Sequence, residues 1–325
     1  MRLTNPSLSL VAAAVMLSGC GDDSTDTPEN DSIVARAQAT PSLSTLVAAV
    51  QFASDNNDLV TLLDSPGTLT VFAPSNAAFD ALAVELTGNP SATGADLLTA
   101  ENKPLLRTVL RYHVLTSTVN ASEIPFGKPI TSAESSVFKI DTGSPPTITD
   151  GRNRTAQITT TDIEASNGVI HLIDRVILPA DKTIVETAQA LAAGNPAEFT
   201  VLVEAVVAAD LVTTLNGPGP FTVFAPTDAA FVAVLAELGV TKAALFADKP
   251  LLTKVLTYHV ASSRLFEADV PVGQQITMVQ SGTISIDANL GIIDARARVS
   301  NIIATDTLTS NGVIHVIDKV LLPAP

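Results

Sequence analysis

The chain contains three sequence motifs twice, in the same order. The first copy has LTVFAPSNAAF at 69–79, LRYHV at 110–114 and SNGVIHLID at 166–174. The second has FTVFAPTDAAF at 221–231, LTYHV at 256–260 and SNGVIHVID at 310–318. The offsets are 152, 146 and 144 residues. Such a long period indicates two tandem globular domains, because the units of solenoid proteins are only about 20–50 residues long.

The first copy is slightly longer than the second. The offset shrinks mainly between the first two motifs, so the extra residues fall in the segment Gly88–Lys103. This segment is rich in Gly, Pro, Asn and Ser, which predicts a surface loop, where insertions cost little. We expect the two domains to span residues 32–180 and 181–325.

The first 19 residues are expected to be a secretory leader. A lone Arg2 precedes an apolar run from Leu8 to Leu17 that is too short to span a bilayer as a helix. The run ends in LSGC, which resembles the lipobox of bacterial lipoproteins, with the only cysteine of the chain, Cys20, at the acceptor position. The resemblance implies cleavage before Cys20 and its acylation. Several acyl chains there would hold the protein stably on a membrane.

Residues 20–31 are expected to form the lipidated end and a flexible acidic tether. No later run of 18 or more apolar residues occurs, so no transmembrane helix is expected beyond the leader. The resemblance implies an extracytoplasmic, envelope-bound protein. Gly21 rather than Asp follows the cysteine, which favours the outer membrane of a Gram-negative host, although Asp22 weakens that inference.

Composition excludes several classes of partner. The formal charge of −15 disfavours nucleic acid and anionic lipid headgroups. Trp is absent and aromatic residues make up 4% of the chain, which argues against a lectin that stacks sugars on aromatic rings. No cysteine remains for an internal disulfide once Cys20 is acylated, so each domain must be held by its core.

Local patterns predict that each copy begins with helices and ends with short strands. The expected helices are 33–37, 43–52 and 104–111 in the first copy and 183–188, 199–211 and 250–257 in the second. In each first motif, a strand should end at Pro74 or Pro226, and Ser75 or Thr227 should cap the next helix. The Asn-Gly pairs should form hairpin turns, because both residues accept positive φ. The order predicts an α+β fold with a mostly antiparallel sheet or sandwich.

Together the motifs resemble those of the fasciclin domain family. VFAP-[ST]-[ND]-AAF resembles its first signature block, Tyr-His its central motif, and NGVIH-[LV]-ID its second block. The resemblance covers 32–325. It implies two wedge-shaped β-sandwiches, each with a helical cluster on one side, and adhesion modules that bind proteins, matrix or one another. Some members bind apolar molecules such as carotenoids. The motif residues expected to be structural are Phe72, Pro74, Phe79, Asn167, Gly168, His171, Asp174, Phe224, Pro226, Phe231, Asn311, Gly312, His315 and Asp318.

The four histidines all lie inside motifs, which makes a metal site one candidate. His171 and Asp174, like His315 and Asp318, are three residues apart on a predicted strand and should therefore point to opposite faces. A pair of His113 and His171 remains geometrically conceivable but lacks an evident third ligand. We expect no metal or cofactor, with His171 and His315 buried and hydrogen-bonded to backbone.

The Tyr-His pairs are open to two interpretations. Tyr112, His113, Tyr258 and His259 could form the interaction motif, since the family resemblance links this region to adhesion. Alternatively, the tyrosines pack beside the core and the histidines fix the turn after the helix. The first interpretation predicts that changing Tyr258 and His259 to Ala abolishes adhesion without altering the melting curve.

Catalytic motifs are missing from the sequence, which contains no Gly-x-Ser-x-Gly elbow, phosphate-binding glycine loop or His-x-x-x-His pair. We therefore expect a protein that is not an enzyme but a lipid-anchored adhesion protein. Its partners would be a protein, matrix or polymer on a cell surface, with the membrane reached through Cys20. The alternative is a carrier of an apolar, carotenoid-like ligand in a groove between helices and sheet.

Overall fold

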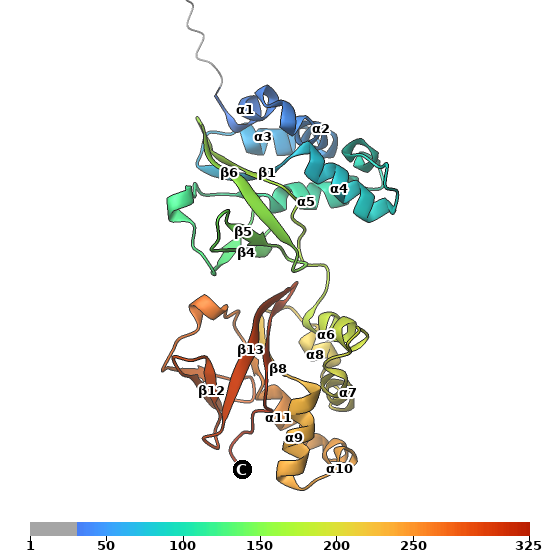
Figure 1. The fold of residues 1–325 in the computed structure, drawn as a ribbon, viewed down its shortest axis with the longest axis vertical. Helices are drawn as coiled ribbons and strands as arrows, with labels where there is room; N and C mark the ends of the chain where they lie inside the picture. Colours follow the sequence, from blue (N-terminus) through green and yellow to red (C-terminus); the bar gives the residue numbers. More distant parts are fainter. Residues whose placement is uncertain (1–30) are drawn as a thin grey trace, which may run out of the picture. The chain divides into compact units, whose positions relative to one another are not determined.

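The computed structural model describes residues 31–325. The predicted leader, Cys20 and most of the predicted tether lie outside the described residues. Within 31–325, no helix is long and apolar enough to cross a membrane. The described chain contains two copies of one arrangement, each with helices before and after its first strand and then a run of strands (Figure 1).

The first copy runs from α1 to β7. Its helices are α1 (Ile33–Ala39), η1 (Pro41–Leu43), α2 (Ser44–Ala53), α3 (Asp58–Asp64), α4 (Asn76–Thr87), η2 (Gly94–Leu97), α5 (Lys103–Tyr112) and η3 (Ala121–Glu123). Its strands are β1 (Leu69–Pro74), β2 (Val114–Leu115), β3 (Pro129–Thr131), β4 (Val137–Asp141), β5 (Thr147–Thr149), β6 (Thr155–Ala165) and β7 (Gly168–Ile173).

The second copy runs from α6 to β14. Its helices are α6 (Ile184–Ala192), α7 (Thr200–Ala208), α8 (Val212–Leu215), α9 (Asp228–Leu238), α10 (Lys242–Ala247), α11 (Lys249–Thr257) and η4 (Glu267–Asp269). Its strands are β8 (Phe221–Pro226), β9 (Val260–Ala261), β10 (Gln275–Thr277), β11 (Thr283–Ile286), β12 (Gly291–Ile293), β13 (Val299–Thr309) and β14 (Gly312–Ile317).

Each copy has one seven-stranded sheet. The strand orders are β2-β1-β7-β6-β5-β4-β3 and β10-β11-β12-β13-β14-β8-β9, which are the same topology read from opposite edges. Every pair is antiparallel except β1 with β7 and β8 with β14, which are parallel. The predicted α+β fold with a mostly antiparallel sheet is therefore confirmed. The strand of the first motif pairs directly with the strand of the last.

The first motif forms the predicted strand, turn and helix in both copies. Ser75 Oγ accepts a hydrogen bond from the N–H of Ala78, and Thr227 Oγ1 accepts one from Ala230. Each cap satisfies one of the free N–H groups at a helix N-terminus. The proline before each cap is the last residue of its strand and lies opposite Ile173 or Ile317.

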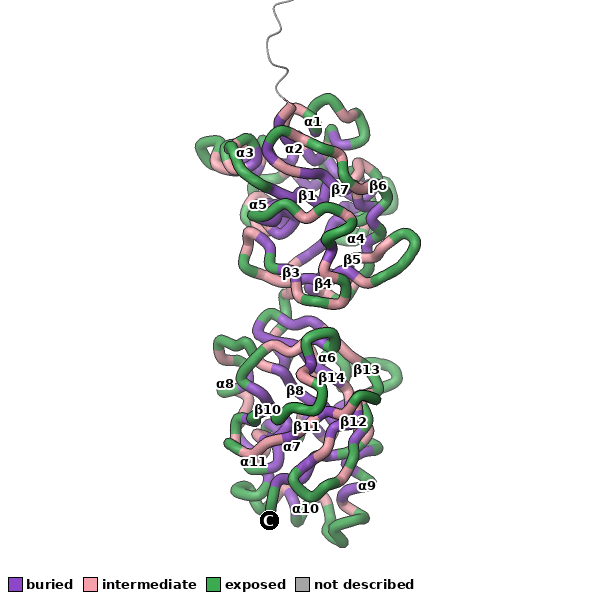
Figure 2. The backbone as a smooth tube through the Cα atoms, turned by 90° about the vertical axis from the view of Figure 1, so that its left-hand side faces the viewer, coloured by how far each residue is buried: buried purple, intermediate pink, exposed green. Residues whose placement is uncertain are grey.

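The central strands separate two hydrophobic cores in each copy. Val71 and Ala73 of β1 face the helices, whereas Phe72 packs with Tyr112 and Phe138 in a second core enclosed by the strands. Period-two alternation on β1 explains this division, because successive side chains point to opposite faces. The second copy repeats it, with Val223 and Ala225 on one face of β8. Figure 2 shows the buried positions gathered on these central strands.

The predicted hairpin turn is shifted by one residue. Ala165 pairs with Gly168, so the residues that connect β6 and β7 are Ser166 and Asn167 rather than an Asn-Gly turn. Gly168 is already a strand residue and has φ +154°. An added Cβ there would lie 2.1 Å from the carbonyl oxygen of Leu69. Glycine is thus required by the close approach of the neighbouring parallel strand.

The segment predicted to be a plain surface loop has structure of its own. Residues 94–97 form η2, which packs against α4, and Leu97 is buried in the helix-side core. The turn residues in this segment gave no hint of that packing. The corresponding stretch of the second copy contains helix α10 instead.

Candidate functional site

The tyrosines of the Tyr-His motifs are completely buried. Tyr112 Oη donates to the carbonyl oxygen of Val137 at 2.7 Å and accepts from the N–H of Gly151 at 3.0 Å. Tyr258 makes the matching bonds to Thr283 at 2.6 Å and Ala295 at 2.9 Å. Burial raises the pKa of both phenols, so each hydroxyl remains a donor at neutral pH. Each tyrosine joins its helix to two separate parts of the sheet.

The histidines of the same motifs are also buried and use both ring nitrogens. His113 Nδ1 lies 2.7 Å from the carbonyl oxygen of Val109, and Nε2 accepts from the N–H of Ile177 at 3.1 Å. His259 repeats this pattern with Val255 at 2.8 Å and Leu321 at 2.8 Å. Burial lowers the pKa of each histidine to about 4, so both are neutral at pH 7. The neutral ring is the form that can donate through Nδ1 and accept through Nε2.

The histidines of the last motif lie in the core with different partners. His171 Nε2 lies 2.9 Å from the carbonyl oxygen of Val119, and its Nδ1 accepts from the N–H of Asp162. His315 makes the same contacts with Leu265 and Asp306. All four rings thus contact backbone groups. Among residues 31–325, no group of three or more His, Cys, Asp or Glu side chains could hold a metal ion.

Asp174 and Asp318 bind neighbouring backbone rather than histidine. Asp174 Oδ1 accepts from the N–H of Gln157 at 2.7 Å. Asp318 accepts from the N–H and Nδ2 of Asn301 and from Ser300 Oγ. These bonds hold the pKa of Asp318 below its usual value, although burial acts in the opposite direction. The motif aspartates therefore fasten the start of the long strand β6 or β13 to the chain that leaves β7 or β14.

The motif asparagines connect the first helix of each copy to its sheet. Asn167 Oδ1 accepts from the N–H of Ile33, and its Nδ2 donates to the carbonyl oxygens of Leu63 and Ser65. Asn311 repeats these three bonds with Ile184, Leu215 and Gly217. The asparagine side chain of the motif thus forms hydrogen bonds to distant segments of its copy. The prediction of a hairpin turn did not include this role.

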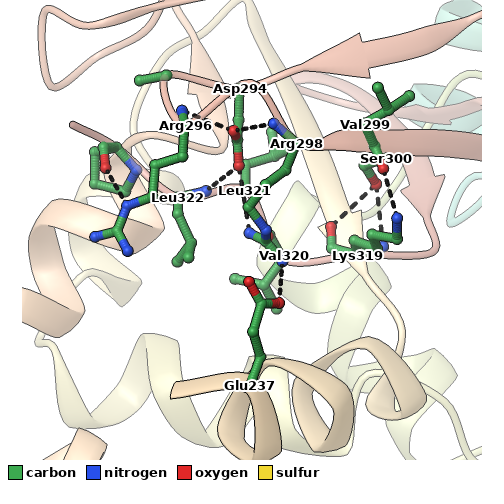
Figure 3. A network of polar contacts seen from close by, with 12 residues as sticks. Glu237, Asp294, Arg296, Arg298, Val299, Ser300, Lys319, Val320, Leu321 and Leu322 are labelled. Carbon is green, nitrogen blue, oxygen red and sulfur yellow. Dashed lines mark hydrogen bonds and ion pairs between the residues drawn. The ribbon is translucent and has the colours of Figure 1, made fainter. Parts of the chain in front are cut away.

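The structure adds a matched pair of buried carboxylates, one in each copy, to the predicted set. Asp294 is 6% exposed and accepts from the N–H groups of Arg296, Arg298 and Leu322. Arg298 also contacts Asp294 through Nη1 at 3.3 Å and Glu237 of α9 through Nη2 at 2.8 Å (Figure 3). The carboxylate thus joins the turn after β12 to the segment after β14.

Asp150 occupies the matching place in the first copy. It accepts from the N–H groups of Arg152, Arg154 and Leu178, and Arg154 bridges it to Glu85. The sequence carried a signal for this pair, because Asp-x-Arg-x-Arg occurs at 150–154 and again at 294–298. The offset equals that of the last motif.

Each copy has an apolar cavity between its helices and its sheet. The first measures about 60 Å³ and is lined by α1, α2 and α3 together with Val71, His113 and Ile170. The second measures about 40 Å³ and has matching walls, including Val223, His259 and Ile314. Small-molecule sites usually measure roughly 300–1,000 Å³. Both cavities are much smaller than this.

The fold and these contacts define a tandem of two α+β modules whose shared motifs build their cores. A model of the fasciclin domain matches residues 41–179 and 197–323. The chain belongs to the fasciclin domain family. The structural interpretation of the repeated residues fits this assignment, because each motif makes the same contacts in both copies.

Relatives of the chain include bacterial and animal proteins. Protein sll1483 from Synechocystis is 42% identical over 144 residues, covering 43% of this chain and 73% of its own. Transforming growth factor-beta-induced protein ig-h3 from pig is 30% identical over 264 residues, covering 80% of this chain. The chain spans about a third of that relative, 35% of its length. Human periostin is 27% identical over 271 residues, 83% of this chain and 30% of its own.

A solved structure has a similar pair of domains. It is described as a FAS1 domain pair from the insect cell adhesion molecule fasciclin I. It covers 86% of this chain and 97% of its own, with 18% sequence identity and a TM-score of 0.41.

Proposed function

We propose that this protein is an adhesion protein of the cell envelope that binds a protein, matrix or polymer partner. The observation that carries the proposal is the match of two consecutive segments to the fasciclin domain, a family whose members are mostly adhesion modules. The repeated contacts of the motif residues support the proposal, because these contacts hold the fold together. Recognition is then left to the exposed surface.

The charge of the chain limits the surface that it can bind. There are 33 acidic against 18 basic residues, so basic or neutral partners are favoured over anionic ones. Two modules in one chain would also strengthen weak contacts, since the second contact forms at the high effective concentration that the first creates.

The Tyr-His motif takes an indirect part in this proposal. Tyr258 is completely buried and His259 is 2% exposed, so neither side chain is available to a partner in the described fold. We propose that the motif sets the position of the exposed turns to which it is bonded. In the double Tyr258→Ala, His259→Ala variant, adhesion and the melting transition should therefore be lost together. Lost adhesion with an unchanged melting curve would favour direct contact instead.

We further propose that acylation of Cys20 anchors the protein outside the cytoplasm, on the outer membrane if the host is Gram-negative. The basis is the lipobox-like LSGC at 17–20. The Cys20→Ser variant, expressed in the native host, should be found in the soluble or secreted fraction, while the unaltered protein stays with membranes. Equal membrane retention of both would contradict the anchor.

The carrier alternative has one specific observation in its favour, the matching cavities between helices and sheet. At about 60 and 40 Å³ they would have to open widely for a carotenoid-like molecule. Native mass spectrometry of protein extracted gently from its host separates the two functions. A discrete added mass of a few hundred daltons beyond the lipid would support the carrier, and a co-purified protein or polymer would support adhesion.

A further inference from the structure

The second copy has an apolar groove that is far larger than its helix–sheet cavity. It lies between α9, α10 and α11 on one side and residues 320–325 on the other, and measures about 340 Å³. We call it the α10 groove. Its apolar lining includes Leu238, Ala244, Leu245, Leu251 and Leu252. Its volume falls at the lower end of the range for small-molecule sites.

In the first copy the corresponding groove is nearly closed. It measures about 20 Å³ and is lined by the matching leucines of α4 and α5, with Leu97 of η2 among them. Leu97 is 2% exposed. In the first copy η2 packs against α4 at this place, whereas the second copy has α10 in the corresponding stretch. The α10 groove is therefore a feature of one copy and is not required by the common fold.

Two cations line the α10 groove. Lys254 Nζ donates to the carbonyl oxygen of Ala324 at 2.8 Å, and Arg296 Nε donates to that of Pro323 at 3.1 Å. Within residues 31–325 neither has a carboxylate partner, although the chain is strongly acidic. Figure 3 shows the Arg296 guanidinium directed away from the Asp294–Arg298–Glu237 cluster.

The first copy differs from the second at the positions of these two cations. Arg152, which matches Arg296, forms an ion pair with Asp181 at 3.1 Å, and Thr108 stands where Lys254 would be. The one acidic residue that lines the α10 groove is Asp248. Its carboxylate accepts from the N–H of Leu251 and caps α11. The cations of the second copy are thus left available to an outside anion.

A polar depression adjoins the apolar groove. It measures about 610 Å³ and is lined by Gln280, Ser281, Thr283 and Asp294, among others. Lys254 and residues 323–325 line both hollows. A ligand in the α10 groove therefore has an apolar wall for its body and cations beside a polar hollow for its end.

We propose that the α10 groove binds a single-chain amphiphile with a carboxylate end, such as a free medium-chain fatty acid. The hydrocarbon chain lies among α9, α10 and α11, and the carboxylate lies against Lys254 and Arg296. Burial of the hydrocarbon chain in the apolar groove favours binding, and the cations select the anionic head. This inference stands independently of the proposed adhesion.

The test is calorimetric titration of the full protein with dodecanoate below its micelle concentration. One molecule should bind per chain. Ala244→Trp, which fills the groove from an exposed position of α10, should weaken binding at least tenfold, whereas Ala243→Trp, exposed on the same helix but outside the groove, should not. Urea unfolding of each variant checks that the fold is kept.

A second set of variants tests the role of charge, and every side chain that it changes is exposed. Lys254→Gln with Arg296→Gln should weaken dodecanoate binding about tenfold, and Lys182→Gln with Lys319→Gln, an equal charge change elsewhere, should leave it within twofold. Absence of binding to the unaltered protein would overturn the proposal. Binding that Ala244→Trp and the Lys254/Arg296 pair leave unchanged would overturn it as well.

Discussion

The N–H of Ile33 donates a hydrogen bond of 2.9 Å to Oδ1 of Asn167, which lies 134 residues later in the chain. The bond joins the first residue of the first helix to the turn before the last strand. Ile184 and Asn311 form the same bond, also at 2.9 Å, in the second copy. In both copies the bond joins the two ends of the module, so the asparagine side chain helps to hold the module closed.

Replacing Asn167 by Ala should therefore destabilise the first domain. Three buried or partly buried backbone groups would lose their partner, and leaving such groups unsatisfied costs about 1–3 kcal/mol each. We expect a loss of about 3 kcal/mol in the free energy of unfolding, measured by urea titration. Ser166→Ala, in the same turn, should change it by less than about 0.5 kcal/mol. Equal effects of the two changes would contradict the assigned role.

Replacing Gly168 by Ala should also be costly, for a different reason. The new Cβ would lie 2.1 Å from the carbonyl oxygen of Leu69 and force the parallel strands apart. We expect about 3 kcal/mol of destabilisation, similar to other forced overpacking. Gly67→Ala is the control, because a Cβ there meets nothing within 4 Å. A stable Gly168→Ala variant would show that the strands can separate cheaply.

Replacing Asp294 by Asn should destabilise the second domain by about 3 kcal/mol, since breaking one side of a buried ion pair leaves the other charge poorly compensated. Asp294 also accepts three backbone N–H groups, which an amide oxygen can satisfy only in part. Asp287→Ala is unsuitable as a control, because the Asp287 carboxylate accepts a hydrogen bond from the N–H of Gly291. Glu237→Gln serves better, since it removes only the half-exposed partner of Arg298 and should cost under about 1 kcal/mol.

The protein should lose stability in mild acid. The pKa of His113 and of His259 falls from 6.5 in the unfolded chain to about 4 in the fold. Between these values the unfolded state binds more protons, so stability is full above pH 6.5 and falls as the pH drops toward 4. Each histidine should remove about 3 kcal/mol across this window.

Urea midpoints between pH 7.5 and 4 measure this effect. The lowered pKa of Asp318 adds a further loss only below about pH 4, where that carboxylate protonates. The double His113→Gln, His259→Gln variant should be less stable at pH 7 and lose part of the slope between pH 6.5 and 4, while burial of His315, which also lowers its pKa, leaves a remainder. A wild-type midpoint that stays constant from pH 7 to 5 would contradict the assigned neutral, buried rings.

The sequence predicted the local parts of this structure well. Ser75 and Thr227 cap helices because their partners lie three residues ahead, and local patterning indicated the strands and the α+β class. Asn167 was misjudged because its partners are about 100–134 residues away, where no local rule reaches. The hydrogen-bonding roles of Asp150 and Asp294 depend on the segments after β7 and β14 and were missed for the same reason.

The site shows the same division. The duplication indicated which residues are structural, since the repeated motif residues make repeated contacts. It could not reveal what differs between the copies. The α10 groove depends on how the segment between α9 and α11 packs and on two cations that have no carboxylate partner within residues 31–325, and both become visible only when the helices are packed.

Attachment of host cells under flow is the decisive test of an adhesive role. Native host cells with and without the intact gene product, and with the Cys20→Ser form, are compared on matrix and on a layer of the same cells. We expect firm attachment with the native protein, loss of attachment without it, and inhibition when purified protein is added in solution. Equal attachment of all three strains on both surfaces would contradict an adhesive role.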